Sequence, residues 1–134
     1  MNDDQATVLV VDDTPENIDV LVAILKDDYN VKAARSGEQG LKIARLPNPP
    51  DLILLDIMMP GIDGFEVCKQ LKEGPTTCDI PVIFVTAKIS TEDEIHGFEL
   101  GAVDYITKPI SPPVVRARVK THIALHDQNR ELGR

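Results

Sequence analysis

Residues 52–56 read Leu-Ile-Leu-Leu-Asp, four consecutive apolar side chains followed by a carboxylate. A strand that is apolar at every position has both faces buried, which is typical of a parallel sheet covered by helices on both sides. Residues 8–11 (Val-Leu-Val-Val) and 82–85 (Val-Ile-Phe-Val) show the same pattern. Residues 30–34 and 103–106 are expected to be two further strands. The stretch 52–56 therefore predicts the centre of a parallel sheet that ends in an acidic side chain.

Helical patterns separate these expected strands. Thr14 before Pro15 is expected to cap the first helix, because proline at the first helical position has no N–H to leave unpaired. The later helices are expected to begin at capping boxes, in which a short polar side chain precedes an acid or amide by three residues: Ser36 with Gln39, Asp63 with Glu66, and Thr91 with Glu94. Ser111 and Pro112 are expected to begin the last helix.

Strands and helices that alternate in this way predict an α/β fold with helices on both faces of the sheet. We expect a flavodoxin-like, doubly wound, five-stranded parallel sheet with the strand order 2-1-3-4-5. The 134 residues are enough for one domain, which we place at residues 1–124. Residues 125–134 are expected to be a C-terminal helical extension or linker, with packing to about Ala124 and an exposed tail beyond it.

The net charge of −8 comes from 14 Lys and Arg against 22 Asp and Glu. An acidic surface argues against nucleic acid and against an anionic membrane as direct partners. No apolar run approaches the length of a membrane span, and the acidic residues 1–5 lack the basic region of a signal peptide. Two cysteines are too few for a disulfide framework. We therefore expect a cytoplasmic protein, and its acidic charge leaves room for cations as ligands.

Polar side chains gather at the carboxyl ends of the expected strands, where open α/β sheets bind their ligands. Asp12 and Asp13 follow the first strand, and Asp56 ends the third. Thr86 ends the fourth strand and Lys108 follows the fifth. The predicted strand order places the ends of the first and third strands side by side. Three carboxylates should therefore converge, with a hydroxyl and an ammonium group beside them.

Three close carboxylates repel one another unless they are protonated or paired with a cation. Mg²⁺ takes oxygen ligands and keeps several waters while it binds one or two carboxylates. A metal, a lysine and a hydroxyl around one carboxylate suit a phosphoryl group, whose transfer depends mainly on positioning and charge neutralisation. A carboxylate can itself be the nucleophile and form an aspartyl phosphate. The pattern predicts phosphoryl chemistry at this edge of the sheet.

The chain closely resembles the receiver domains of bacterial two-component response regulators. The matching stretches lie in order along nearly the whole chain, from residue 7 to about residue 124. They are residues 8–13 (VLVVDD), 54–64 (LLDIMMPGIDG), 81–87 (PVIFVTA) and 101–109 (GAVDYITKP).

The resemblance implies specific roles for these residues. Asp56 is the implied phosphoacceptor, and Lys108 and Thr86 are implied to contact the phosphoryl oxygens. The implied Mg²⁺ pocket, in which Mn²⁺ is a possible substitute, consists of Asp12, Asp13, Asp56 and the backbone carbonyl of Met58, with Asp13 and Asp56 favoured as direct ligands. Tyr105 is the implied aromatic switch partner of Thr86, turning inward on phosphorylation. A cis peptide bond is implied before Pro109.

The function implied is a bacterial, phosphorylation-driven switch. A sensor histidine kinase or a histidine phosphotransfer protein would supply the phosphoryl group, and the receiver would catalyse its own phosphorylation and could speed its dephosphorylation. The switch would control an output domain or a downstream protein. A homodimer through the fourth helix, fifth strand and fifth helix is a further expectation.

Three other functions are weighed against this one. An aspartyl-phosphate phosphohydrolase typically carries a second acid two residues after its nucleophile, where this chain has Met58. A flavodoxin-like flavin site needs a hydroxyl-rich phosphate loop, whereas Asp12 and Asp13 would repel the phosphate. A receiver-like interaction module that is not regulated by phosphorylation remains open at this stage, although the intact acidic pocket argues against it.

Overall fold

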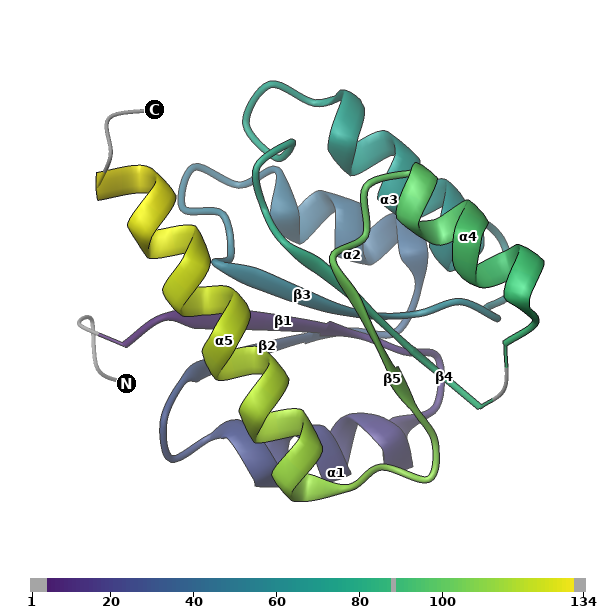
Figure 1. Cartoon of the computed structure of the whole chain (residues 1–134), viewed down its shortest axis with the longest axis horizontal. Coiled ribbons are helices and arrows are strands. Elements are labelled where there is room, and N and C mark those ends of the chain that lie inside the picture. Colours follow the sequence, from purple (N-terminus) through teal and green to yellow (C-terminus); the bar gives the residue numbers. More distant parts are fainter. Residues whose placement is uncertain (1–4, 88, 132–134) are drawn as a thin grey trace.

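The computed structural model describes residues 5–87 and 89–131. Strands and helices alternate through these residues (Figure 1). The strands are β1 (Thr7–Val11), β2 (Asn30–Ala34), β3 (Leu52–Asp56), β4 (Val82–Thr86) and β5 (Asp104–Thr107). The helices are α1 (Pro15–Leu25), α2 (Gly37–Ala44), α3 (Gly64–Glu73), α4 (Thr91–Glu99) and α5 (Pro112–Glu131).

The strands form a parallel sheet in the order β2-β1-β3-β4-β5, which confirms the predicted topology. Helices α1 and α5 cover one face, and α2, α3 and α4 lie on the other (Figure 1). Successive strand residues point to opposite faces, so each apolar strand supplies both cores. The α2–α3 core takes Leu9, Val11, Ile53, Leu55, Val82 and Phe84. The α1–α5 core takes Val8, Val10, Leu52, Leu54, Ile83 and Val85.

Two of the predicted cap residues are confirmed. The Ser36 hydroxyl accepts a hydrogen bond from the Gln39 N–H at 3.1 Å, and an Asp63 carboxylate oxygen accepts one from the Glu66 N–H at 2.9 Å. Each bond satisfies a backbone donor that has no partner inside the helix. The Gln39 side chain accepts from the Arg35 N–H at 2.9 Å, one residue before the cap position.

One cap prediction is confirmed in position only, and another is wrong. Thr14 occupies the cap position of α1, but its side chain makes no capping hydrogen bond. The cap of α4 is Ser90, whose hydroxyl accepts from the Asp93 N–H at 3.1 Å, and Thr91 is already helical. The two candidate hydroxyls are adjacent in the sequence, so pattern alone could not choose between them.

One element boundary also differs from expectation. The last strand covers Asp104–Thr107, one residue later than predicted. Helix α5 starts at Pro112 as expected and continues past Ala124 through Glu131, which agrees with the helical alternative for the predicted extension. Packing nevertheless ends near the predicted point, because Ile123 is buried and Leu125 is 49% exposed. The expected tail is thus helical as far as residue 131, and residues 132–134 lie outside the described part. No described helix has the length and apolar character needed to cross a bilayer.

Candidate functional site

Asp12 and Asp13 lie directly beyond β1. The Asp12 N–H donates to the Ala34 carbonyl of β2 at 3.1 Å, so the backbone remains attached to the sheet where the acidic pair begins. Asp12 is 1% exposed, and Asp13 is half-buried. An Asp12 carboxylate oxygen accepts from the Thr14 N–H at 2.9 Å, which fixes the Asp12 carboxylate at the start of α1.

Asp56 is the last residue of β3 and lies beside Asp12. The register pairs Val11 with Leu55, so the next residue of each strand end falls at the same level of the sheet. Asp56 is itself paired with Val85 of β4 and is 6% exposed. Two buried carboxylates therefore meet where β1 and β3 end.

Lys108 lies between these two carboxylates. Its Nζ is 3.3 Å from an Asp12 oxygen and 3.7 Å from an Asp56 oxygen. The Lys108 backbone N–H donates to the Thr86 carbonyl at 2.8 Å, and the bond to Pro109 is cis, as the resemblance implied. Because Lys108 is anchored to the end of β4, its ammonium group is directed at the site from a segment 96 residues from Asp12.

The three aspartates form one acidic cluster. One oxygen each from Asp12, Asp13 and Asp56 lies within 4.8 Å of the others. The pKa of Asp56 is raised to about 6, chiefly by burial and then by the Asp12 charge, while Lys108 and a hydrogen bond from the Met58 backbone act in the opposite direction. The Lys108 ammonium group does not fully offset the burial of Asp56 and its repulsion by the other two carboxylates. The site therefore favours the binding of a further positive charge.

This donor set fits a hard divalent cation. Such ions bind carboxylate and carbonyl oxygens, and Mg²⁺ rarely uses more than two carboxylates. Asp12, Asp13 and Asp56 are the residues that could hold it. The Met58 side chain is 76% exposed, and the predicted use of its backbone carbonyl as a ligand stays a prediction.

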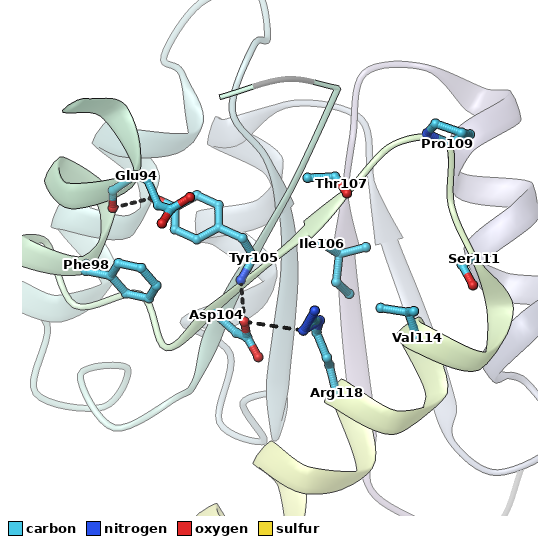
Figure 2. A pocket seen from close by; sticks show the side chains of 10 residues that line it. All are labelled: Glu94, Phe98, Asp104, Tyr105, Ile106, Thr107, Pro109, Ser111, Val114 and Arg118. Carbon is cyan, nitrogen blue, oxygen red and sulfur yellow. Dashed lines mark hydrogen bonds and ion pairs between the residues drawn. The ribbon is translucent and has the colours of Figure 1, made fainter. Parts of the chain in front are cut away.

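Thr86 and Tyr105 lie on the neighbouring strands. Thr86 is 4% exposed at the end of β4 and pairs with Thr107. Tyr105 is already directed inward, at 8% exposure. Its hydroxyl lies 3.0 Å from the Glu94 carbonyl (Figure 2) and 3.3 Å from the Asp93 carbonyl. Burial, followed by the nearby Glu94 charge, raises the pKa of Tyr105 to about 12. Tyr105 therefore already occupies the inward position that the resemblance implied for the phosphorylated state.

Sequence reasoning missed two residues of this site. The Asn17 side-chain amide in α1 donates to Asp12 at 3.4 Å. The backbone N–H of Gly64, the first residue of α3, donates to the Ile57 carbonyl at 2.8 Å and closes the loop after Asp56. Asn17 could have been found from its place in the first turn of the helix that starts at the acidic pair, and Gly64 from its position after the Asp63 cap.

Comparison with known proteins gives a consistent result. The model of the response regulator receiver domain family matches residues 8–120. A probable cyclic di-GMP phosphodiesterase of Vibrio cholerae is 52% identical over 119 residues, which are 89% of this chain and 27% of that protein. The response regulator PleD of Caulobacter vibrioides is 47% identical over 117 residues, or 87% of this chain and 26% of PleD.

A solved receiver-domain structure has the same fold as this chain. The BeF3-activated DrrB receiver domain is 32% identical, has a TM-score of 0.80, and aligns over 90% of this chain and 98% of its own. The chain thus spans about a quarter of the two curated relatives, and nearly all of an isolated receiver domain.

Proposed function

Because the chain belongs to the response regulator receiver domain family, we propose that Asp56 accepts a phosphoryl group from the phosphohistidine of a sensor histidine kinase or a histidine phosphotransfer protein. One observation carries the proposal: Asp56 is buried beside two further carboxylates and has a lysine ammonium group 3.7 Å away. Such an environment suits a carboxylate nucleophile whose product carries additional negative charge.

The proposed reaction forms a bond between an Asp56 oxygen and phosphorus and breaks the bond from phosphorus to the donor nitrogen. Asp56 must be ionised to attack, and Lys108 supports the ionised form. After transfer, the Lys108 ammonium group would bind the phosphoryl oxygens, which then carry the negative charge. The Thr86 hydroxyl would donate a hydrogen bond to one of these oxygens. Asp12, Asp13, Asp56 and the Met58 carbonyl would hold Mg²⁺, or Mn²⁺ in its place, which when bound neutralises charge on the carboxylates and the phosphoryl group.

The phosphoryl group would act as a switch through Thr86 and Tyr105. A ligand shifts a conformational equilibrium only when it contacts the two states differently. Thr86 can supply that difference because it ends β4 beside the acceptor strand, and Tyr105 lies on the next strand along. The face formed by α4, β5 and α5 would carry the change to an output domain or a downstream protein. Response regulators of this kind are expected in the bacterial cytoplasm.

The test is phosphoryl uptake in Mg²⁺ with acetyl phosphate as donor, read by intact-mass spectrometry. The wild-type chain should gain one phosphoryl group, and Asp56→Asn should gain none. Asp63→Asn is the matched control, since Asp63 is an exposed aspartate of the same loop and asparagine also caps helices well. Undiminished labelling of Asp56→Asn would overturn the assignment, and no labelling of the wild type would favour an interaction module that phosphorylation does not regulate.

A further inference from the structure

Gly97 lies in α4 opposite the Tyr105 ring, and it is the buried residue of that helix. A Cβ atom at this position would overlap the Tyr105 hydroxyl oxygen. It would also lie 3.0 Å from Tyr105 Cζ and 3.0 Å from Phe84 Cε2. The Tyr105 hydroxyl group therefore occupies the space that the Cβ atom of any other residue at position 97 would need.

Hydrogen bonds and ring contacts hold the tyrosine in this space. Its hydroxyl bonds to carbonyls of the first turn of α4, at Asp93 and Glu94. Its ring packs at 5.5 Å from the ring of Phe84, which is fully buried, and at 5.1 Å from that of Phe98 (Figure 2). The overlap with a Cβ atom would fall on the far end of the tyrosine side chain, which can rotate away, rather than on the backbone.

We propose that Gly97 is a positioning residue of the switch, because the missing Cβ atom is what admits Tyr105 to its inward position. Any larger residue would shift the Tyr105 equilibrium outward without touching the acidic site. This inference rests on the proposed function for its link to phosphorylation, but the steric part concerns the unphosphorylated chain alone. Coupling between Thr86 and the α4–β5–α5 face would then depend on a residue that contacts neither the phosphoryl group nor the metal.

The experiment labels the chain with 3-fluorotyrosine and records the fluorine NMR spectrum without a phosphodonor. Tyr29 packs against the opposite core and provides an internal reference. In Gly97→Ala the inward population of Tyr105 should fall by about tenfold or more, with the Tyr105 resonance moving toward its unfolded position and gaining solvent isotope sensitivity. Gly40→Ala is the matched control, because a Cβ there would meet Val11 at 2.9 Å, far from Tyr105.

A double-mutant cycle separates this role from a general loss of packing. Tyr105→Phe removes the oxygen that a Cβ at position 97 would overlap, so Gly97→Ala should destabilise the Tyr105→Phe variant less than it destabilises the wild type. Should Gly97→Ala alone fail to fold, recovery of folding in the double variant supports the proposal, and continued failure overturns it. An unchanged Tyr105 resonance in Gly97→Ala also overturns it.

Phosphoryl uptake distinguishes this inference from the proposed function. Gly97→Ala should gain the same mass as the wild type in acetyl phosphate and Mg²⁺, yet in beryllofluoride its Tyr105 resonance should stay nearer the outward position than the wild-type resonance does. A wild type that takes up no phosphoryl group would refute the proposed function and leave the steric result intact. A Tyr105 resonance in Gly97→Ala that coincides with the wild-type resonance in beryllofluoride would refute the role of Gly97 in the switch.

Discussion

At Asp56, burial and two neighbouring carboxylates oppose ionisation more strongly than Lys108 supports it, so the pKa is raised from 3.8 to about 6. A raised carboxyl pKa means that the native state holds a proton that the unfolded chain has released. The free energy of unfolding therefore falls as pH rises from about 4 to about 6, and this loss persists at higher pH. The proposed phosphoacceptor thus lowers the stability of the metal-free fold at neutral pH.

Asp56→Asn should remove the loss of stability that the buried Asp56 charge causes above about pH 6. In EDTA at about pH 8 the variant is expected to be more stable than the wild type by on the order of 2 kcal/mol, with the difference shrinking toward about pH 4 as Asp56 becomes protonated. Urea unfolding across this pH range measures both effects. A stability difference that does not change with pH would show that the Asp56 charge is not its source.

Asp13 provides a second prediction at this scale. Its oxygen lies within the acidic cluster although its side chain is only half-buried. A cation that binds the folded chain raises its melting temperature, so Mg²⁺ should stabilise the wild type, and Asp13→Ala should lose this rise. Glu16→Ala is the control, because Glu16 is an exposed acid in the first turn of α1. An unchanged rise in Asp13→Ala would remove Asp13 from the site.

Among the elements, the start of α3 determines the course of the loop that follows Asp56. A Cβ at Gly64 would overlap the Asp56 carbonyl oxygen and lie 2.8 Å from Ile57 Cα. Both contacts are to backbone, which cannot move without displacing the loop. The close approach of α3 to the end of β3 therefore requires glycine at this position.

Gly64→Ala should cost about 1–3 kcal/mol of stability, in the range of overpacking substitutions, and should slow phosphoryl uptake from acetyl phosphate. Gly37→Ala is the matched control. Gly37 is also the first residue of a capped helix, but the atoms nearest to a Cβ there are side-chain atoms of Ile62 and Val67. Equal uptake rates in both variants would show that the α3 contact does not position Asp56.

For the whole molecule, a homodimer is expected to form through the face made by α4, β5 and α5. A hollow of about 400 Å³ lies on it, lined in part by Tyr105 and Arg118 (Figure 2). Phe98 is 46% exposed and Val114 is 38% exposed beside it. Apolar side chains with a charged margin are typical of protein interfaces.

We expect sedimentation to show association when beryllofluoride and Mg²⁺ are added, and Val114→Asp should weaken it. Val20→Asp is the control, because Val20 is exposed to a similar degree, at 46%, on α1. A monomer under both conditions, at concentrations up to the high micromolar range, would argue against the homodimer.

Much of this molecule follows from local pattern. Uninterrupted apolar runs predict strands buried on both faces, and parallel strands place their carboxyl ends at one edge. With the common doubly wound order 2-1-3-4-5 adopted for the sheet, the meeting of Asp12, Asp13, Asp56 and Lys108 could therefore be predicted from the sequence. The caps at Ser36 and Asp63 were predictable for a similar reason, since each bond joins residues three apart.

Other features depend on contacts between distant segments. Thr14 lacks a capping bond, while its own N–H is bound by Asp12, whose carboxylate is held in place by Lys108 from across the sheet. The inward Tyr105 depends on empty space at Gly97, eight residues earlier and on another element. The strand ends and the polar residues at them could be predicted from the chain alone, because continuous apolar runs mark where each buried strand stops. The tertiary structure alone decided that Asp12 binds the Thr14 N–H and that the Tyr105 hydroxyl fills the space beside Gly97. Both features depend on how separate elements pack against one another, which no local pattern encodes.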